Sequence, residues 1–263
     1  MQRISFLHNI SHHLSLSLTL ARQNLRVKYS RTLLGTGWVL LQPILPACLY
    51  TIFLGRIFQI PFPSQIPYEL YVFSGLLCWN LFAYVLHQSG TSLLEAEHFL
   101  GKIGFPKLLF PLSKVWSGGL DFFLVWVVLV LGMFWWGYVP DGYWLLLPFP
   151  ILLLLLFALG LGCFMSSLSF RVRDLHHILP LVSQLGIWIT PVFYHPSIVP
   201  VEIRNILMMN PLSTIIAVFR WIVFSGSFPD FETLFWHSML IICLFGSGVW
   251  YFLHSEKYLQ DAR

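Results

Sequence analysis

The basic residues of this chain avoid its long apolar stretches and gather on every second connection between them. Of the fifteen Lys and Arg, only Arg56, Arg204 and Arg220 fall elsewhere. Basic connections stay on the cytoplasmic side, so this asymmetry predicts a multi-pass membrane protein with both termini in the cytoplasm. Composition agrees, because 10% of the residues are charged, whereas soluble domains carry about 25%. The other cations are Arg3, Arg22, Arg26, Lys28, Arg31, Lys102, Lys107, Lys114, Arg171, Arg173, Lys257 and Arg263.

A helix that crosses a bilayer needs about 20 mainly apolar residues. Five stretches qualify, and a shorter one at 178–193 is apolar enough that we expect it to cross as well. An even number of crossings returns the chain to its starting side, in agreement with two cytoplasmic termini. We therefore predict an all-α fold, a single membrane domain over 1–263 with six transmembrane helices. The longer stretches are 38–58, 68–86, 115–138, 144–170 and 234–253.

Residues 206–224 form a further apolar stretch that is interrupted. Asn210-Pro211 breaks it, and Arg220 lies within it. Proline lacks a backbone donor and Asn-Pro favours a turn, so we expect two short helices that dip into the membrane as a re-entrant outer loop. The alternative is a seventh crossing, which would place the C-terminal tail outside.

The N-terminal residues have the pattern of an amphipathic helix. Their apolar residues recur at spacings of three and four, which places them on one helical face. Because a membrane span follows directly, we expect 1–36 to lie in the cytoplasmic interface, although a soluble amphipathic helix has the same pattern. The membrane region is then 38–253 and the cytoplasmic tail 254–263. The stripe consists of Leu7, Ile10, Leu14, Leu18, Ala21 and Leu25.

Motifs of enzymes and metal sites are missing from the sequence. There is no GxxxxGK[ST] phosphate loop and no HExxH. The pairs His12-His13 and His176-His177 are adjacent, so their side chains point to different sides of a helix and make poor metal ligands. No basic run with interleaved aromatics suggests a nucleic-acid surface. A transporter, channel or scaffold is favoured over an enzyme.

Two kinds of reactive side chain lie in or beside the apolar segments. The cysteines sit in four different segments without CxxC spacing, so we expect free, buried thiols. Asp121 near the start of an apolar stretch is a functional candidate. A plain interfacial ion pair with Lys114 is the interpretation we favour. The cysteines are Cys48, Cys78, Cys163 and Cys243.

A set of short motifs follows in a fixed order along nearly the whole chain. They are Tyr29-Ser30, Leu34-Gly35, Trp38 and Pro43 after a basic segment, Phe105-Pro106 in the 95–114 loop, Arg173-Asp174, Thr190-Pro191-Val192-Phe193-Tyr194, and Asn210-Pro211 followed by Arg220. No single motif is specific. Their order, in a chain of 263 residues, resembles the membrane subunit of bacterial polysaccharide-exporting ABC transporters, the O-antigen, capsule and teichoic-acid group.

The resemblance implies a homodimeric permease in the bacterial cytoplasmic (inner) membrane, working with two copies of a separate ATPase. ATP and Mg would bind to that partner, and this chain would carry no cofactor and no catalytic residue. The substrate would be a polysaccharide, such as an O-antigen linked to a lipid pyrophosphate. The residues implied in coupling to the ATPase are Lys102, Phe105, Pro106, Lys107, Arg173 and Asp174, and those of an outer gate are Asn210, Pro211 and Arg220.

A pore for a sugar polymer needs stacking surfaces that do not bind tightly, and aromatic faces provide them. About half of the candidates should instead face lipid or pack inside the protein. Arg26, Lys28 and Arg31 are placed to meet a carrier pyrophosphate, although positive-inside anchoring explains them equally well. The candidate channel residues are Trp38, Tyr50, Trp79, Tyr84, Trp188, Phe193 and Tyr194.

Two other functions stay open at this point. One is an ABC permease for a small drug or lipid, which would leave the cell-surface glycan unchanged when deleted. The other is a membrane-embedded enzyme acting on a lipid carrier, which would form product without ATP or a partner.

Overall fold

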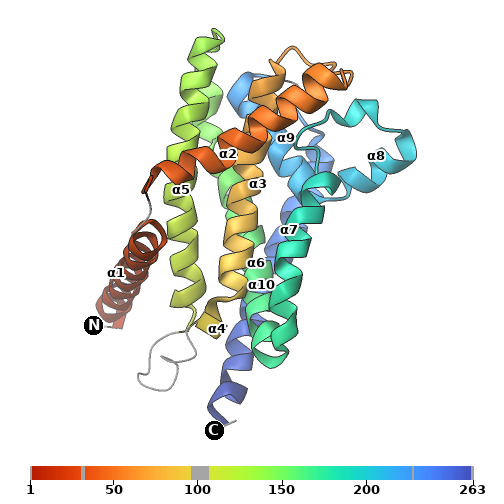
Figure 1. Ribbon diagram of the computed structural model, residues 1–263. Helices are drawn as coiled ribbons and strands as arrows, with labels where there is room; N and C mark the ends of the chain where they lie inside the picture. Colours follow the sequence, from red (N-terminus) through yellow and green to blue (C-terminus); the bar gives the residue numbers. More distant parts are fainter. Residues whose placement is uncertain (1, 31–32, 96–106, 227, 262–263) are drawn as a thin grey trace.

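The computed structural model describes residues 2–30, 33–95, 107–226 and 228–261, and every regular element within these ranges is helical (Figure 1). The elements are α1 (Gln2–Tyr29), α2 (Gly37–Tyr50), the π-helical η1 (Thr51–Ile57), α3 (Tyr68–Gly90), α4 (Ser92–Glu95), α5 (Leu109–Trp135), η2 (Gly142–Leu146), α6 (Pro148–Arg171), η3 (Arg173–His177), α7 (Ile178–Ile189), η4 (Pro196–Ile198), α8 (Val201–Met208), α9 (Pro211–Phe224) and α10 (Phe231–Asp261). Both termini and α4 lie at one end of the bundle, and α8 lies toward the other (Figure 1).

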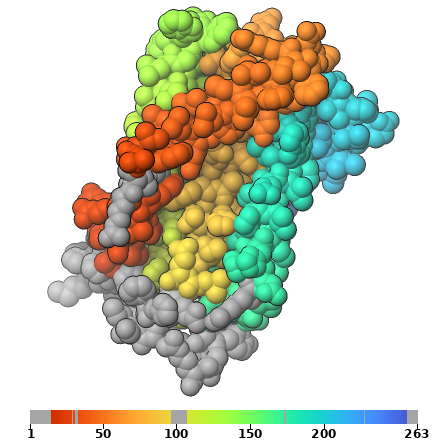
Figure 2. Space-filling model, viewed as in Figure 1, coloured from red at the N-terminus to blue at the C-terminus, as the bar shows by residue number. Residues whose placement is uncertain are grey.

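Five helical segments are long and apolar enough to cross a membrane, and they match the five longer stretches predicted from the sequence. One of them, made of α2 and η1, runs diagonally over a face of the molecule (Figure 2). The chain is therefore a multi-pass membrane protein. The segments are Gly37–Ile57, Tyr68–Gly90, Leu109–Trp135, Gly142–Arg171 and Phe231–Ser255.

The predicted break at Asn210-Pro211 is confirmed. There α8 and α9 meet at an angle of 87°, so the pair is one bent span or a re-entrant loop. Asn210 starts α9 because its side-chain oxygen accepts a hydrogen bond of 3.1 Å from the Leu212 N–H. Pro211 occupies the first turn of α9, where a backbone N–H would have no helical acceptor.

The helix α7 is shorter than the predicted stretch 178–193. It has 12 residues, which is about 18 Å of helix and less than the hydrocarbon thickness of a bilayer. It ends because Pro191 disfavours a helical conformation at the preceding residue, and Thr190 is indeed extended, with φ of −105° and ψ of 134°.

The central helix of the bundle is α3. The rest of the chain buries 72% of the most apolar 18-residue stretch of α3, compared with 28% of that of α5 and 17% of that of α10. Its neighbours α2, α5, α6 and α7 pack around it and turn apolar faces outward, as lipid-facing helices do. The cysteines follow this pattern: Cys78 and Cys163 are buried, but Cys48 on α2 and Cys243 on α10 are exposed. The prediction of four buried thiols was wrong for these two because α2 and α10 are peripheral.

The helices α6 and α10 approach most closely at glycines. A Cβ at Gly160 would lie 2.6 Å from Phe245 Cα, and a Cβ at Gly248 would overlap the Gly160 carbonyl. Without a hydrophobic driving force between helices in lipid, small residues matter because they allow backbones to approach and gain van der Waals contact.

A layer of buried serines joins helices at the end of the bundle that carries α4. Ser92 Oγ on α4 lies 3.2 Å from Ser166 Oγ on α6, and Ser166 Oγ also accepts a hydrogen bond from the Leu93 N–H. Ser255 on α10 donates to Ser167 Oγ at 2.9 Å. These hydroxyl groups satisfy one another where water is scarce.

The predicted N-terminal helix is present as α1, and it packs against α5 with Ala21 of the predicted stripe on the buried side. Ser17 and Ala21 are buried, whereas Leu18 is 39% exposed. Asn24 Nδ2 donates a hydrogen bond of 3.3 Å to Ser113 Oγ on α5. Small and polar side chains let α1 and α5 lie close together.

Candidate functional site

Four of the predicted channel residues lie together where α2 meets the end of α7. Tyr50 stacks on Phe193 with a centroid distance of 4.6 Å, and Trp188 meets Phe193 edge to face at 4.7 Å. Tyr194 contacts Phe193 at 5.8 Å. Phe193 is 2% exposed, but Trp188 is 55% exposed and presents its indole at the surface of the chain. We call Tyr50, Trp188, Phe193 and Tyr194 the aromatic cluster.

Hydrogen bonds from tyrosine hydroxyls to backbone carbonyls fix the aromatic cluster. Tyr194 donates to Trp188 O at 3.0 Å, Tyr68 to Phe193 O at 2.7 Å and Tyr71 to Tyr194 O at 3.1 Å. Burial, with a smaller contribution from Tyr71, raises the pKa of Tyr194 to about 12, so its hydroxyl stays a neutral donor. Sequence reasoning missed Tyr68 and Tyr71, although their spacing of three at the start of α3 places them on one helical face.

Arg220 on α9 is buried and closes the turn that follows α7. Its Nη1 donates to Pro191 O at 2.9 Å, and its Nη2 donates to Val192 O at 2.7 Å and Tyr71 O at 2.9 Å. Its Nε donates to Ser74 Oγ, and its Cζ lies 3.4 Å from the centroid of the Tyr71 ring. A helix end leaves carbonyls without partners, and a guanidinium with five donors suits such a site.

Two of the predicted gate residues, Asn210 and Arg220, attach the bent pair to the α7 turn, and the role of the three residues as an outer gate stays a prediction. Asn210 Nδ2 donates a hydrogen bond of 2.9 Å to Thr190 Oγ1, and Arg220 holds the next two carbonyls. Pro211 is buried at the start of α9. A movement of the pair would therefore move the backbone that carries Phe193 and Tyr194.

Beside the same turn, His195 is an uncharged acceptor. Its Nδ1 accepts a hydrogen bond from the Ser197 N–H at 3.3 Å, and its ring lies 6.3 Å from the Phe62 ring. Burial, and then the positive charges of Arg220 and Arg204, lower the pKa of this imidazole. The turn thus presents rings without a fixed charge of their own.

The other three predicted channel residues lie away from the aromatic cluster. Trp79 is buried, and its ring packs against Gly186 of α7 and Phe82. Tyr84 faces Gly118 of α5, while Trp38 is exposed at the start of α2. In the single chain Trp79 therefore packs α3 against α7.

Two ion pairs lie toward the end of the bundle that carries the termini. Lys28 Nζ is 2.6 Å from Asp121 Oδ2 and 4.5 Å from the centroid of the Tyr84 ring. Lys114 pairs instead with Glu95 at 2.6 Å. The expected pair of Asp121 with Lys114 was wrong, because seven residues separate them along α5 by about 10 Å. Asp121 already compensates Lys28, one of the three cations predicted to meet a pyrophosphate.

Removing the Asp121 carboxylate should loosen α1 from α5. We expect Asp121→Asn to lower the free energy of unfolding by about 1–2 kcal/mol, because both charges are partly screened. Proteolysis between α1 and α2 should become faster. Glu95→Gln is the matched control and should have a smaller effect, since Glu95 is 49% exposed. Recovery of stability in Lys28→Asp/Asp121→Lys would support the pair, and an unchanged Asp121→Asn protein would contradict it.

The residues predicted to couple to an ATPase are only partly described. Lys102, Phe105, Pro106 and the carrier-site candidate Arg31 lie outside the described residues. Lys107 is buried, whereas Asp174 on η3 and Arg26 on α1 are exposed. Arg173 begins η3, two residues after the last residue of α6. The coupling role of these residues stays a prediction.

Nothing in the described ranges resembles a metal centre, since no group of three His, Cys, Asp or Glu side chains there could hold an ion. The aromatic cluster and the Arg220 turn offer ring faces and hydrogen-bonded backbone.

Comparison with known proteins gives a consistent picture. Residues 16–224 match the family model described as ABC-2 type transporter. The chain is 25% identical over 248 residues to an "O-antigen export system permease protein RfbA" of Klebsiella pneumoniae, covering 94% of this chain and 95% of the relative. It is 28% identical over 235 residues to a protein of the same name from Myxococcus xanthus, covering 88% of each.

Proposed function

This chain belongs to the ABC-2 type transporter family, and we propose that it is the membrane subunit of an exporter for a lipid-linked polysaccharide such as an O-antigen. The family is one of non-catalytic membrane permeases. Support for the substrate class comes from the aromatic cluster together with relatives named as O-antigen export permeases. ATP and Mg then act on a separate ATPase, present in two copies.

The aromatic cluster suits a polymer that must slide. The Tyr194 hydroxyl already donates to a backbone carbonyl and Trp188 presents an exposed indole, so the cluster offers ring faces more than hydrogen bonds. Sugar C–H edges stack on such faces while sugar hydroxyls keep their water. Contact is then favourable at each position along the polymer and tight at none.

A second copy of the chain would complete the pathway. Most exposed side chains of α7 are apolar, and only 22% of the most apolar stretch of the span Gly37–Ile57 is buried. Two copies that face each other through α2 and α7 would place both Trp188 side chains along one central passage. The exposed large apolar residues of α7 are Ile178, Leu181, Val182, Leu185, Trp188 and Ile189, and the polar Gln184 is exposed as well.

Removing two rings of the aromatic cluster tests this proposal. We expect Tyr50→Ala/Trp188→Ala to slow the appearance of glycan on the cell surface by about tenfold, since two stacking contacts are each worth about 0.5–1.5 kcal/mol. Trp236→Ala is the matched control, because Trp236 is 62% exposed on the peripheral α10. Surface glycan is quantified against protein level and co-purification of an ABC-type ATPase. Normal export by the double variant, or a pure protein without an ATPase, would overturn the proposal.

A further inference from the structure

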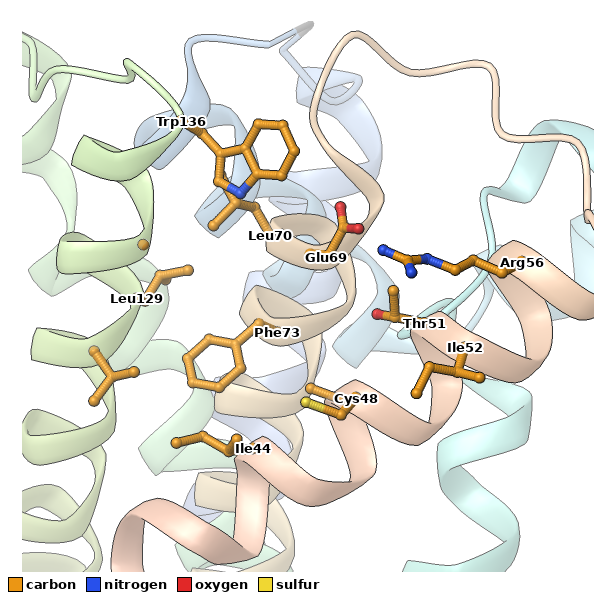
Figure 3. Close-up of a pocket in the computed structure, with 13 residues that line it drawn as sticks. Ile44, Cys48, Thr51, Ile52, Arg56, Glu69, Leu70, Phe73, Leu129 and Trp136 are labelled. Carbon is orange, nitrogen blue, oxygen red and sulfur yellow. The ribbon is translucent and has the colours of Figure 1, made fainter.

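An open apolar groove lies between α2 with η1, α3 and α5, on a different side of α3 from the aromatic cluster. Its volume is about 430 Å³ (Figure 3). Its inner part is lined by hydrocarbon side chains, among them Ile44, Phe73 and Leu129. In a bilayer, the hydrocarbon chains of lipids contact a groove of this kind on the lipid-facing side of a protein.

The polar residues of the groove lie at one end. Arg56 comes from the last turn of η1, Glu69 from the first turn of α3 and Trp136 from the end of α5. Figure 3 shows the Arg56 guanidinium and the Glu69 carboxylate directed toward each other across this end, with Ile44 at the other. All three residues lie at span ends, where tryptophan and charged side chains meet the lipid headgroups.

Arg56 and Glu69 do not form an ion pair or a hydrogen bond with each other in this structure. The ion pairs within the described part of the chain do not include them, and neither side chain hydrogen-bonds to another described residue. Arg56 is also one of the three cations that lie outside the alternate connections on which the other basic residues gather. A cation and an anion that face the same opening without touching match a ligand that carries one charge of each sign.

We propose that this groove binds a zwitterionic phospholipid, with the phosphate on Arg56, the ammonium on Glu69 and an acyl chain along Ile44 and Phe73. The polarity of the groove runs in the same direction as that of the lipid, from charge at the surface to hydrocarbon inside. The site lies in the leaflet away from the termini. It does not depend on the polysaccharide function, because its residues are not those of the aromatic cluster.

Native mass spectrometry of the full chain, titrated with phosphatidylethanolamine or phosphatidylglycerol, tests the headgroup. The wild type should bind phosphatidylethanolamine more tightly. Arg56→Gln should weaken binding of both lipids about tenfold, since a charge-assisted hydrogen bond to phosphate is lost. Glu69→Gln should abolish the preference and leave phosphatidylglycerol binding unchanged. Equal affinities in the wild type would overturn the headgroup assignment.

Filling the groove tests the acyl chain. A Cβ at Gly132 would make only an ordinary contact of 3.4 Å with Leu70, so Gly132→Leu should fold and occupy the groove. It should lower the affinity for either lipid about tenfold, whereas Gly119→Leu on the same helix, with open space around it, should not. Unchanged binding by Gly132→Leu would place the lipid elsewhere.

Other occupants give different results. A retained lipid-linked glycan in place of phospholipid would assign the groove to the substrate carrier. Cys48 lines the groove and is exposed, so in a Cys243→Ser background it reports a second copy. Rapid disulfide formation between two Cys48 thiols in vesicles would show that another chain covers the groove, and either result would overturn the proposal.

Discussion

Arg220→Leu is expected to lower the free energy of unfolding by about 2–4 kcal/mol, because two carbonyls at the end of α7 lose their only described donor. Tyr71 also loses the guanidinium stacked on its ring. Arg220→Lys should recover less than half of the loss, since an ammonium lacks the planar fork that reaches both carbonyls. Thermal unfolding of the purified chain in detergent measures the difference.

A second variant reaches the same site without touching the arginine. A Cβ at Gly75 would collide with Arg220 Nη2 and lie 2.7 Å from Val192 O, so Gly75→Ala should destabilise the turn as well. Gly119→Ala, which has open space, serves as its control. If Arg220→Leu and Gly75→Ala both unfolded at the wild-type temperature, the Arg220 contacts would carry no stability.

The second large effect is expected at the contact of α6 with α10. Gly248→Val would place a branched side chain against the Gly160 carbonyl, and backbone on the facing helix has no rotamer by which to yield. We expect a loss of about 3 kcal/mol or more in the free energy of unfolding.

Gly246 provides the matched control for this substitution. It lies two residues away on α10, and a Cβ there meets no atom within 4 Å. Gly246→Val should stay within about 0.5 kcal/mol of the wild type, because it alters helix propensity alone. Equal unfolding temperatures for the two variants would show that the close contact of α6 with α10 at Gly248 does not contribute to stability.

The helices and the break at Asn210-Pro211 could be predicted because they depend on local composition. Chain length, apolar runs and a proline determine them within a few residues. The partners of side chains depend on which helices pack together, and this explains why Asp121 pairs with Lys28, 93 residues away, rather than with Lys114 on its own helix. The single sequence held no signal for that pair beyond two opposite charges.

The candidate site shows the same limit. Residue type and position in the sequence do not separate Trp188, which is exposed, from Trp79, which is buried behind Gly186. The contact of α1 with α5 could not be predicted for a related reason. Periodicity predicts one apolar face for α1, but it does not indicate that Ser17 and Ala21 are buried while Leu18 is 39% exposed.

The π-helical segment Thr51–Ile57 sets the direction in which Arg56 points. A π-turn holds one residue more than an α-turn, and one residue corresponds to about 100° of rotation around an α-helix. Winding the same residues as an α-helix would rotate Arg56 relative to the preceding helix and turn the guanidinium away from Glu69. The orientation of this charge therefore depends on how the backbone before it is wound, and a return of that backbone to an α-helix would alter it without changing Arg56 itself.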